Sequence, residues 1–351
     1  MNFADRIITW QKQHGRHDLP WQRTNDPYRI WLSEVMLQQT QVATVIPYFE
    51  RFVARFPDVK ALASAPVESV MAVWAGLGYY SRARNLHQCA QRIADEHGGE
   101  FPRDAQRLAQ LPGIGRSTGA AIAALAFGER AAILDGNVKR VLARHCGIDG
   151  YPGRPKIERQ FWQSAESLLP TYGIQAYTQG LMDLGATVCT RTQPNCAVCP
   201  VYVTCVARST GSIGQLPTPR PVRERAVQER TVLILQDEVG AVFLELRPPS
   251  GIWGGLLSLP EFESEISDQS LVHEVNARFG LQIAVTETLG AIRHEFTHYT
   301  YLMRPRLARV TGTIGVASSR LRCVASEELQ TAPLPAPVRR LLQRLMDTVL
   351  V

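Results

Sequence analysis

The sequence contains little lysine and no long hydrophobic run. Its 351 residues include only four lysines, at positions 12, 60, 139 and 156, so chemistry that needs a lysine amine has few candidates. No apolar stretch approaches the roughly 20 residues that span a bilayer. Charged side chains also interrupt the first fifteen residues, unlike a secretory signal. We therefore expect a soluble protein without a membrane partner. Seven cysteines, three of them scattered, fit a reducing compartment, so we expect the cytoplasm.

Cysteine is also scarce, and four of the seven cysteines lie close together: Cys189, Cys196, Cys199 and Cys205. Spacers of six, two and five residues let the four thiolates converge on one metal centre, either zinc or an iron–sulfur cluster. Zinc sites usually contain two pairs of cysteines, each separated by two to four residues, whereas only one spacer here is that short. The pattern therefore favours iron and sulfur. A disulfide or free buried thiols are the simpler alternative.

The positive charge is concentrated in one half of the chain. Residues 1–208 carry 23 Lys and Arg against 17 Asp and Glu, whereas residues 231–351 carry 11 against 13. This excess is compatible with a polyanionic partner such as DNA, although solvated surface charge explains it equally well.

The hydrophobic pattern predicts two domains joined by a linker. Residues 1–208 show helical spacing and few alternating stretches, which indicates an all-α domain. Residues 209–229 are rich in Pro, Gly and Arg and are expected to form an extended linker. Residues 230–351 are expected to form an α+β domain, with a hairpin of strands at 231–236 and 241–246, a helix at 269–279 and strands near 284–292 and 299–310.

A glycine-containing turn lies between two helical stretches in the segment LPGIGRSTG, residues 111–119. Gly113 and Gly115 permit a tight hairpin and direct the N–H groups of the next helix outwards, an arrangement suited to holding a DNA phosphate. Such a contact positions DNA without reading its sequence. An ordinary interhelical turn would carry the same pattern.

Two carboxylates lie in segments that suggest catalysis. Asp135 precedes a basic helix in ILDGNVKR, where it either caps the helix or faces a positively charged reacting centre. Glu34 lies among apolar residues in SEVML, which would raise its pKa and keep it protonated as a general acid. A solvated glutamate is the simpler alternative for Glu34. The segment GLGYY, residues 76–80, adds aromatic side chains that either insert into a base stack or belong to the core.

These features, taken in their order along the chain, resemble the helix–hairpin–helix DNA glycosylases that carry a four-iron four-sulfur cluster. They are SEVMLQQTQV, GLGYY, LPGIGRSTG, ILDGNVKR and the cysteine spacing. Within that superfamily they resemble the MutY-type adenine glycosylases, over nearly the whole chain. The resemblance implies base excision repair, in which adenine mispaired with 8-oxoguanine or guanine is hydrolysed from double-stranded DNA. It also implies that the four clustered cysteines hold one 4Fe-4S cluster.

The resemblance assigns roles to the carboxylates. Glu34 corresponds to the acid that protonates the extruded adenine at N7, so that a neutral base leaves. Asp135 corresponds to the carboxylate that stabilises the resulting oxocarbenium-like sugar, electrostatically or through a transient covalent bond, and Asn137 supports it. The two carboxyl groups would then hold opposite protonation states at neutral pH.

The same resemblance implies further binding residues. Those expected to contact DNA or the lesion are Gln39, Thr40, Leu77, Tyr79, Gly113, Gly115 and Ser117. Trp21 and Gln179 fall at adenine-pocket positions, although some family members carry a basic residue at Gln22 and an acidic one at Gln179.

Ser117 stands where the related endonuclease III-type glycosylase-lyases have a lysine. Serine cannot form a Schiff base, so the sequence predicts a monofunctional glycosylase with little strand cleavage. Lys139, one turn beyond Asp135, is the remaining amine near the motif.

The carboxy-terminal domain resembles a Nudix fold without its catalytic glutamate box. No RExxEE pattern follows Pro260, so magnesium-dependent pyrophosphate hydrolysis is not expected. Phe296, Thr297 and His298 match the Phe-Ser-His triplet with which the family recognises the lesion, with threonine in place of serine. The hydroxyl can still bond to 8-oxoguanine, but the added methyl group alters the fit.

Three other functions remain open at this point. A bifunctional glycosylase-lyase acting on oxidised pyrimidines is disfavoured by Ser117 and by the long second domain. A non-enzymatic sensor of DNA damage would not need both Glu34 and Asp135. A Nudix hydrolase with a DNA-binding appendage would need the glutamate box. We expect a monomer that acts on DNA at the nucleoid.

Overall fold

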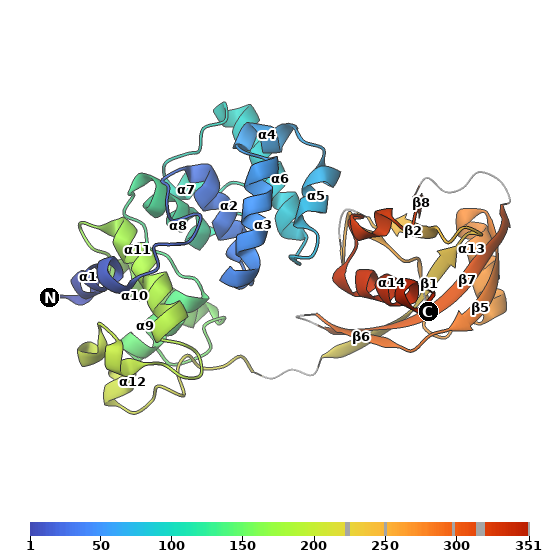
Figure 1. The fold of residues 1–351 in the computed structure, drawn as a ribbon. Coiled ribbons are helices and arrows are strands. Elements are labelled where there is room, and N and C mark those ends of the chain that lie inside the picture. The colour runs from blue at the N-terminus through green and yellow to red at the C-terminus, as the bar shows by residue number, and fades with distance from the viewer. Residues whose placement is uncertain (222–224, 249–250, 297–298, 314–319, 350–351) are drawn as a thin grey trace. The chain divides into compact units, whose positions relative to one another are not determined.

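The computed structural model describes residues 1–221, 225–248, 251–296, 299–313 and 320–349. Its contacts divide the chain into two compact units. One consists of residues 1–65 and 85–222, and the other of residues 66–84 and 223–351. Figure 1 shows helices in the first part of the chain and a twisted sheet with a few helices in the last part.

All regular structure described before residue 222 is helical, which confirms the predicted all-α fold of this part. The longer helices are α1 (Phe3–His14), α2 (Pro27–Leu37), α3 (Val42–Arg55), α5 (Val67–Trp74), α6 (Ser81–His97), α8 (Arg116–Phe127), α9 (Gly136–Cys146), α10 (Pro155–Ser167) and α11 (Ile174–Asp183). The shorter ones are α4 (Val59–Ser64), α7 (Ala105–Leu108), α12 (Val206–Ser209), the π-helical turn η1 (Leu184–Val188) and the 3-10 turns η2 (Cys196–Val198) and η3 (Tyr202–Thr204).

Aspartate side chains determine where several of these helices begin. Asp26, Asp58, Asp104 and Asp135 each precede a helix and accept a hydrogen bond from a backbone N–H of its first turn. Such caps satisfy donors that have no partner inside the helix. The start of α2 is reinforced by Pro27, whose fixed φ suits the first helical position.

The core of the first unit surrounds α9 and α11. Ile7, Leu142, Phe161 and Leu184 are fully buried there, and α11 packs against both α1 and α9. This packing holds the N-terminus of α9 and the C-terminal end of α11 in one region of the unit. The candidate site described below lies in that region.

The second unit contains a mixed sheet. Its strands are β1 (Ala226–Gln236), β2 (Val242–Leu246), β3 (Leu257–Ser258), β4 (Glu261–Phe262), β5 (Leu281–Thr288), β6 (Ile292–Glu295), β7 (Tyr299–Thr313) and β8 (Leu321–Val324). The order β3-β2-β1-β7-β5 places β1 at the centre, parallel to β7 and antiparallel to β2. Residues 231–235 are consecutively buried, as expected for a central strand.

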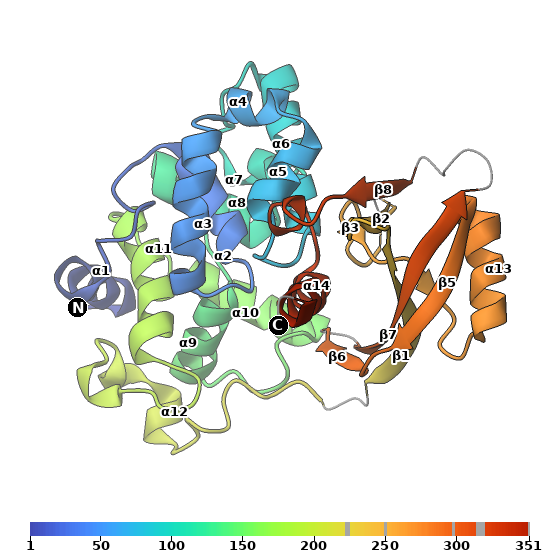
Figure 2. The ribbon, with the colours of Figure 1, turned by 45° about the vertical axis from the view of Figure 1, so that its right-hand side comes forward.

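The α+β prediction for the second unit is confirmed, with differences in extent. The expected hairpin is present, because Leu235 pairs with Phe243 and Gln236 with Val242. Helix α13 (Asp268–Phe279) lies where a helix was predicted, and Figure 2 shows it against β5. Strand β1 begins at Ala226, inside the segment expected to be a linker. The sequence analysis missed β3, β4 and β8, which are too short for a periodic signal, and also α14 (Ala336–Val349).

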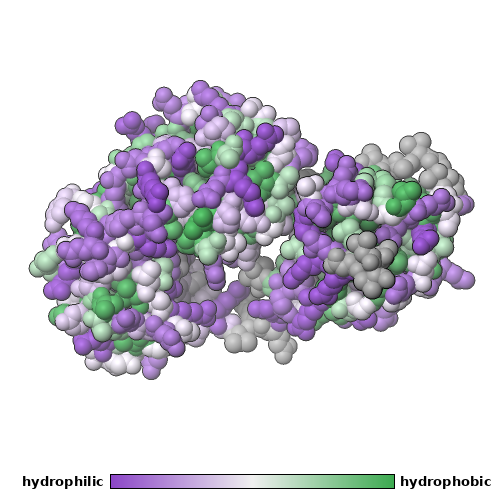
Figure 3. All heavy atoms as spheres, viewed as in Figure 1, coloured by the Kyte–Doolittle hydropathy of each residue, from purple (hydrophilic) through white to green (hydrophobic). Residues whose placement is uncertain are grey.

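The described helices include none that is both long and apolar enough to cross a membrane. Figure 3 shows polar side chains over most of the visible face, with hydrophobic groups in separate patches. Several exposed apolar side chains belong to the cysteine segment and its neighbourhood: Val198, Tyr202, Val203 and Val206.

Candidate active site

Glu34 is carried into a cavity by helix α2, which is otherwise mostly apolar. Trp31 and Met36, on either side of it in the sequence, have no exposed surface. These neighbours surround the carboxyl group with protein atoms, while the side chain keeps limited exposure through the cavity that it lines. The local pattern noted in the sequence therefore does produce an enclosed acid.

Burial, together with the smaller effect of the nearby charge of Asp135, raises the pKa of Glu34 to about 8. No described residue donates a hydrogen bond that would stabilise the Glu34 carboxylate. Because a poorly solvated carboxyl group resists ionisation, Glu34 can hold a proton at neutral pH.

Asp135 is both a helix cap and a cavity residue. As the N-cap of α9, its Oδ1 accepts a hydrogen bond of 2.7 Å from the N–H of Val138. Burial raises the pKa of Asp135, but the N–H groups of Val138 and Asn137 and the charges of Arg140 and Lys139 oppose this rise. Glu34 has no such donors, so Asp135 is the carboxyl group of the pair that ionises first.

One cavity of about 610 Å³ brings together residues that are far apart in the sequence. Those predicted from the sequence that line it are Trp21, Glu34, Thr40, Ser117, Asp135, Asn137 and Gln179. Gln39, Gly113, Gly115, Leu77, Tyr79 and Phe296 do not line it. The cavity therefore collects the predicted catalytic and adenine-pocket residues, and most of the predicted DNA contacts lie elsewhere.

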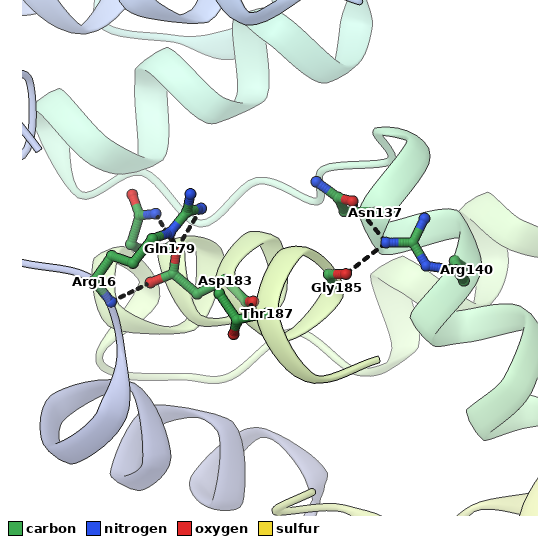
Figure 4. A network of polar contacts seen from close by, with 7 residues as sticks. All are labelled: Arg16, Asn137, Arg140, Gln179, Asp183, Gly185 and Thr187. Atoms are coloured by element: carbon green, nitrogen blue, oxygen red, sulfur yellow. Dashed lines mark hydrogen bonds and ion pairs between the residues drawn. The ribbon is translucent and has the colours of Figure 1, made fainter. Parts of the chain in front are cut away.

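Arg140 holds the side chain of Asn137 by a hydrogen bond, as Figure 4 shows. Arg140 Nη2 donates to Asn137 Oδ1 at 2.7 Å and to the carbonyl oxygen of Gly185, while its Nε donates to the carbonyl oxygen of Cys189 at 2.7 Å. A Cβ atom at Gly185 would lie 2.6 Å from the Cβ of Asn137, so the close approach of η1 to α9 requires glycine there. Sequence analysis identified neither Arg140 nor Gly185 as part of the site.

An ion pair between partly exposed Arg16 and buried Asp183 supports Gln179 (Figure 4). Asp183 has no exposed side-chain surface, and its carboxylate accepts hydrogen bonds from the backbone N–H of Arg16 at 3.0 Å and from Arg16 Nε at 2.7 Å. Gln179 Nε2 donates to Asp183 Oδ1 at 3.0 Å. This bond assigns the amide nitrogen of Gln179 to Asp183 and leaves its oxygen as the group offered to a ligand. An acid inside an apolar run, as at Glu34, was the available signal for Asp183.

Ser117 supports the segment that carries Asp135. Its Oγ accepts a hydrogen bond of 2.8 Å from the N–H of Leu134, the residue before Asp135. Lys139 does not line the cavity, and its Nζ lies 3.1 Å from Glu158 Oε1 in an ion pair. The hydroxyl at the position where related enzymes have lysine thus has a structural partner, and the nearest lysine is engaged elsewhere.

The predicted hairpin has the backbone that a phosphate contact needs. Gly113 adopts φ 76°, and a Cβ atom there would lie 2.8 Å from the Cβ of Asn85. Gly115 is the N-cap of α8, whose first turn has no side-chain cap. The leading N–H groups of α8 therefore point outwards at a helix N-terminus, where anions bind favourably.

Two of the predicted DNA-contact residues have unusual backbone conformations. Gln39 has φ 60° and Tyr79 has φ 49°, and both side chains are exposed. Residues other than glycine rarely adopt this left-handed region, and they occur there preferentially at functional sites. Leu77, by contrast, is buried, with 6% of its surface exposed.

The four clustered cysteines are free thiols that line one small cavity with Arg144. Arg144 is buried; its Nη1 lies 3.4 Å from Cys189 Sγ and donates to the carbonyl oxygen of Thr190 at 2.7 Å. Across the described ranges, no three His, Cys, Asp or Glu side chains are grouped to hold a single metal ion. The four thiols therefore share one cavity.

Part of the predicted lesion-recognition triplet can be located. Phe296 belongs to an aromatic cluster, with its ring centroid 5.7 Å from that of Trp253, 4.6 Å from that of His294 and 4.9 Å from that of Tyr299. Thr297 and His298 lie outside the described residues.

Comparison with protein families gives two matches. Residues 32–167 match the family described as HhH-GPD superfamily base excision DNA repair protein, and residues 231–344 match the NUDIX domain. The first range contains Glu34, Asp135 and the hairpin, and the second contains the sheet.

Curated relatives match almost the whole chain. An adenine DNA glycosylase of Buchnera aphidicola (subspecies Baizongia pistaciae) is 33% identical over 98% of this chain and 96% of the relative. The adenine DNA glycosylase of Homo sapiens is 34% identical over 96% of this chain and 73% of the relative.

Solved structures resemble the helical part. A thermostable thymine-DNA glycosylase is 29% identical, with a TM-score of 0.52, over 59% of this chain and 95% of that structure. An endonuclease III in a non-covalent DNA complex is 22% identical, with a TM-score of 0.50, over 59% of this chain and 94% of that structure, and shares the fold.

Proposed function

Because the chain belongs to the adenine DNA glycosylase family within the HhH-GPD superfamily of base excision repair proteins, we propose that its Glu34–Asp135 cavity is where the adenine glycosidic bond is hydrolysed. The observation that carries this assignment is the presence of both carboxyl groups on one cavity, with the pKa of Glu34 raised to about 8. A proton donor and an anion are thereby available together at neutral pH.

The reaction proceeds by transfer of the Glu34 proton to N7 of an extruded adenine. The electrons of the N9–C1′ bond then pass to the base, which leaves neutral, and positive charge develops on the deoxyribose. The Asp135 carboxylate, held by the Val138 N–H, stabilises that charge. Water adds to C1′, and the proton it loses replaces the one that Glu34 gave up.

Asn137 orients the Asp135 carboxylate, and Gln179 orients the adenine base. Asn137 is fixed by Arg140 beside the Asp135 loop, where it supports the carboxylate. Gln179 offers its amide oxygen, because its nitrogen is bound to Asp183. Adenine presents an exocyclic amine that donates to such an oxygen, whereas the carbonyl group of guanine does not.

We propose that the enzyme is monofunctional. A lyase step needs an amine that attacks C1′ and forms a Schiff base. Ser117 has none, and Lys139 is paired with Glu158. Borohydride should therefore trap little covalent enzyme–DNA adduct, and efficient trapping coupled to strand scission would contradict this assignment.

The mispair partner is proposed to be 8-oxoguanine or guanine in duplex DNA, bound by a monomer at the nucleoid in the cytoplasm. The helix N-terminus after Gly115 would hold a backbone phosphate, while the strained Gln39 and Tyr79 would contact the opened base pair. The Nudix-like domain would read the lesion through the segment that begins at Phe296.

We propose that Cys189, Cys196, Cys199 and Cys205 hold one 4Fe-4S cluster. Four free thiols line one cavity, and a cluster whose four irons each take one thiolate would use all of them. Arg144 and Arg140 place positive charge beside Cys189. The cluster would brace the loop from residue 189 to residue 205 against α9.

A glycosylase assay tests the function. Duplexes containing adenine opposite 8-oxoguanine, adenine opposite guanine, and oxidised thymine opposite adenine are incubated with excess protein, and abasic sites are revealed with alkali. We expect cleavage of the two adenine substrates only, with 8-oxoguanine preferred. Cleavage of the oxidised thymine duplex alone would favour the pyrimidine-specific alternative.

A further inference from the structure

The loop that carries Tyr79 is built around the side chain of Arg82. This loop joins α5 to α6, and Arg82 belongs to the first turn of α6. Only 7% of the surface of Arg82 is exposed, and arginine is almost never buried to this extent without partners. The groups that surround the guanidinium therefore decide what the residue does.

Two aromatic rings and a carbonyl group hold the guanidinium. Its Cζ atom lies 5.3 Å from the centroid of the Trp74 ring and 5.5 Å from that of the Tyr79 ring. Its Nη2 donates to the carbonyl oxygen of Gly78 at 3.2 Å, and the same oxygen accepts a hydrogen bond of 3.1 Å from Trp74 Nε1. A cation within about 6 Å of a ring centroid is attracted to the ring, most strongly where water is excluded. Arg82 thus connects the end of α5, the loop backbone and Tyr79.

The Tyr79 side chain needs such a contact to keep one position. It is 47% exposed, so packing does not fix it. Its φ of 49° lies in a region that residues other than glycine rarely adopt, and such a conformation persists only where surrounding contacts enforce it. Gly76 and Gly78, which also have positive φ, leave the loop backbone without side chains of their own to stiffen it.

We propose that Arg82 is a positioning residue that sets the preference for the base opposite adenine by fixing the Tyr79 ring. A ring that is held in place before DNA binds loses little conformational entropy when it meets the opened base pair. A ring that moves freely would contact 8-oxoguanine and guanine more nearly alike. This inference rests on the proposed glycosylase function and on the proposed contact of Tyr79 with the opened base pair.

Substitutions combined at positions 79 and 82 test the positioning role. Single-turnover cleavage at subsaturating full-length protein is measured for adenine opposite 8-oxoguanine and for adenine opposite guanine, and the ratio of the two rates is the preference. Arg82→Met, which fills most of the same space without the charge, should lower the preference by about tenfold, the scale of one desolvated cation–π contact. The loss should be the same in the Tyr79→Phe background, which keeps a ring. It should vanish in the Tyr79→Ala background, where no ring remains to be held.

Two further measurements separate positioning from a general structural effect or a direct DNA contact. At saturating protein, Arg82→Met should cleave adenine opposite 8-oxoguanine within about twofold of the parental rate, because Arg82 does not line the Glu34–Asp135 cavity. Affinity for a non-cleavable duplex should show the parental salt dependence between about 50 and 200 mM, since a buried guanidinium neutralises no phosphate.

The matched control and a second variant use the same helix. Arg92, also on α6, is half-exposed and pairs with Glu96, so Arg92→Met should leave the preference unchanged. Arg82→Lys keeps the charge but not the planar fork that reaches a carbonyl group and a ring together, and its preference should lie within about twofold of that of Arg82→Met. Because it retains the charge, Arg82→Lys tests the proposal even if Arg82→Met does not fold in urea titrations.

Four results would overturn the positioning role of Arg82. They are an equal loss of preference with tyrosine and with alanine at position 79, an unchanged preference in folded Arg82→Met and Arg82→Lys, a weaker salt dependence in Arg82→Met, and full parental preference in Tyr79→Ala. In each of these cases the parent still cleaves its adenine duplexes. Absence of cleavage by the folded parent would instead contradict the proposed function itself, and the role of Arg82 with it.

Discussion

Raising the pH above about 8 should switch off the enzyme through Glu34. The pKa of this group rises from 4.5 to about 8 because burial removes its solvation and because Asp135 lies nearby. Protonated Glu34 is the proposed acid, so the single-turnover rate of bond cleavage should fall about tenfold for each pH unit above 8. The cleavage rate should also fall at low pH, as Asp135 becomes protonated. The midpoint of this fall should lie above the ordinary pKa of aspartate, since burial raises the pKa of Asp135.

The same shift has a consequence for stability. Between pH 4.5 and about 8, folded Glu34 holds a proton that the unfolded chain has lost, so the free energy of unfolding decreases as the pH rises through this window. At about 1.36 kcal/mol per pKa unit, the full shift is worth at most about 5 kcal/mol. Glu34→Gln removes this penalty. At pH 9 the variant should therefore unfold at higher urea concentration than the parent, even though we expect it to be inactive.

The assay combines single-turnover cleavage from pH 5 to 10 with urea unfolding at pH 5 and pH 9. Glu100→Gln is the matched control, because Glu100 is exposed and does not line the cavity that contains Glu34. It should change neither profile. The reasoning is refuted if the parent keeps its full rate at pH 9.5, if Glu34→Gln cleaves at the parental rate, or if Glu34→Gln is less stable than the parent at pH 9.

Three further predictions concern the surroundings of the site. Ser117→Ala leaves the Leu134 N–H unpaired. The rate of bond cleavage should therefore fall by about tenfold, which corresponds to about 1.4 kcal/mol, while the affinity for the duplex stays within twofold. Ser117→Thr keeps the hydroxyl and should restore most of the rate. Asp183→Asn removes the buried carboxylate that pairs with the partly exposed Arg16 and should lower the free energy of unfolding by about 3 kcal/mol in urea titrations. A control at a half-exposed carboxylate, Asp104→Asn, should cost less than about 1 kcal/mol. Equal losses would count against a stabilising role of the Arg16–Asp183 pair. Cys199→Ser should remove the broad visible absorption of the purified protein, and a colourless parent that contains zinc would contradict the cluster.

Local sequence explains why Glu34 and Asp135 could be predicted. The apolar neighbours of Glu34 belong to its own helix, so its enclosed environment is encoded within a few residues. Asp135 precedes α9 and caps it, and this boundary is likewise readable from adjacent residues. The hairpin glycines could be predicted for the same reason, because the positive φ of Gly113 is a property of the local turn.

Distant contacts explain what could not be predicted. Arg16 and Asp183 are 167 residues apart in the chain, and only packing of α1 against α11 brings them together. The requirement for glycine at position 185 arises from the approach of Asn137. Nothing in the residues next to Gly185 or Arg16 indicates either contact.

By itself, the sequence determined the helical and α+β halves, the enclosed environment of Glu34, the cap at Asp135 and the clustering of four thiols, because each depends on residues that are close together in the chain. Only the tertiary structure decided which groups share a cavity and how Gln179 and Asn137 are oriented. These features depend on packing between α1, α2, α9 and α11, and such packing brings together side chains whose separation along the chain leaves no periodic pattern.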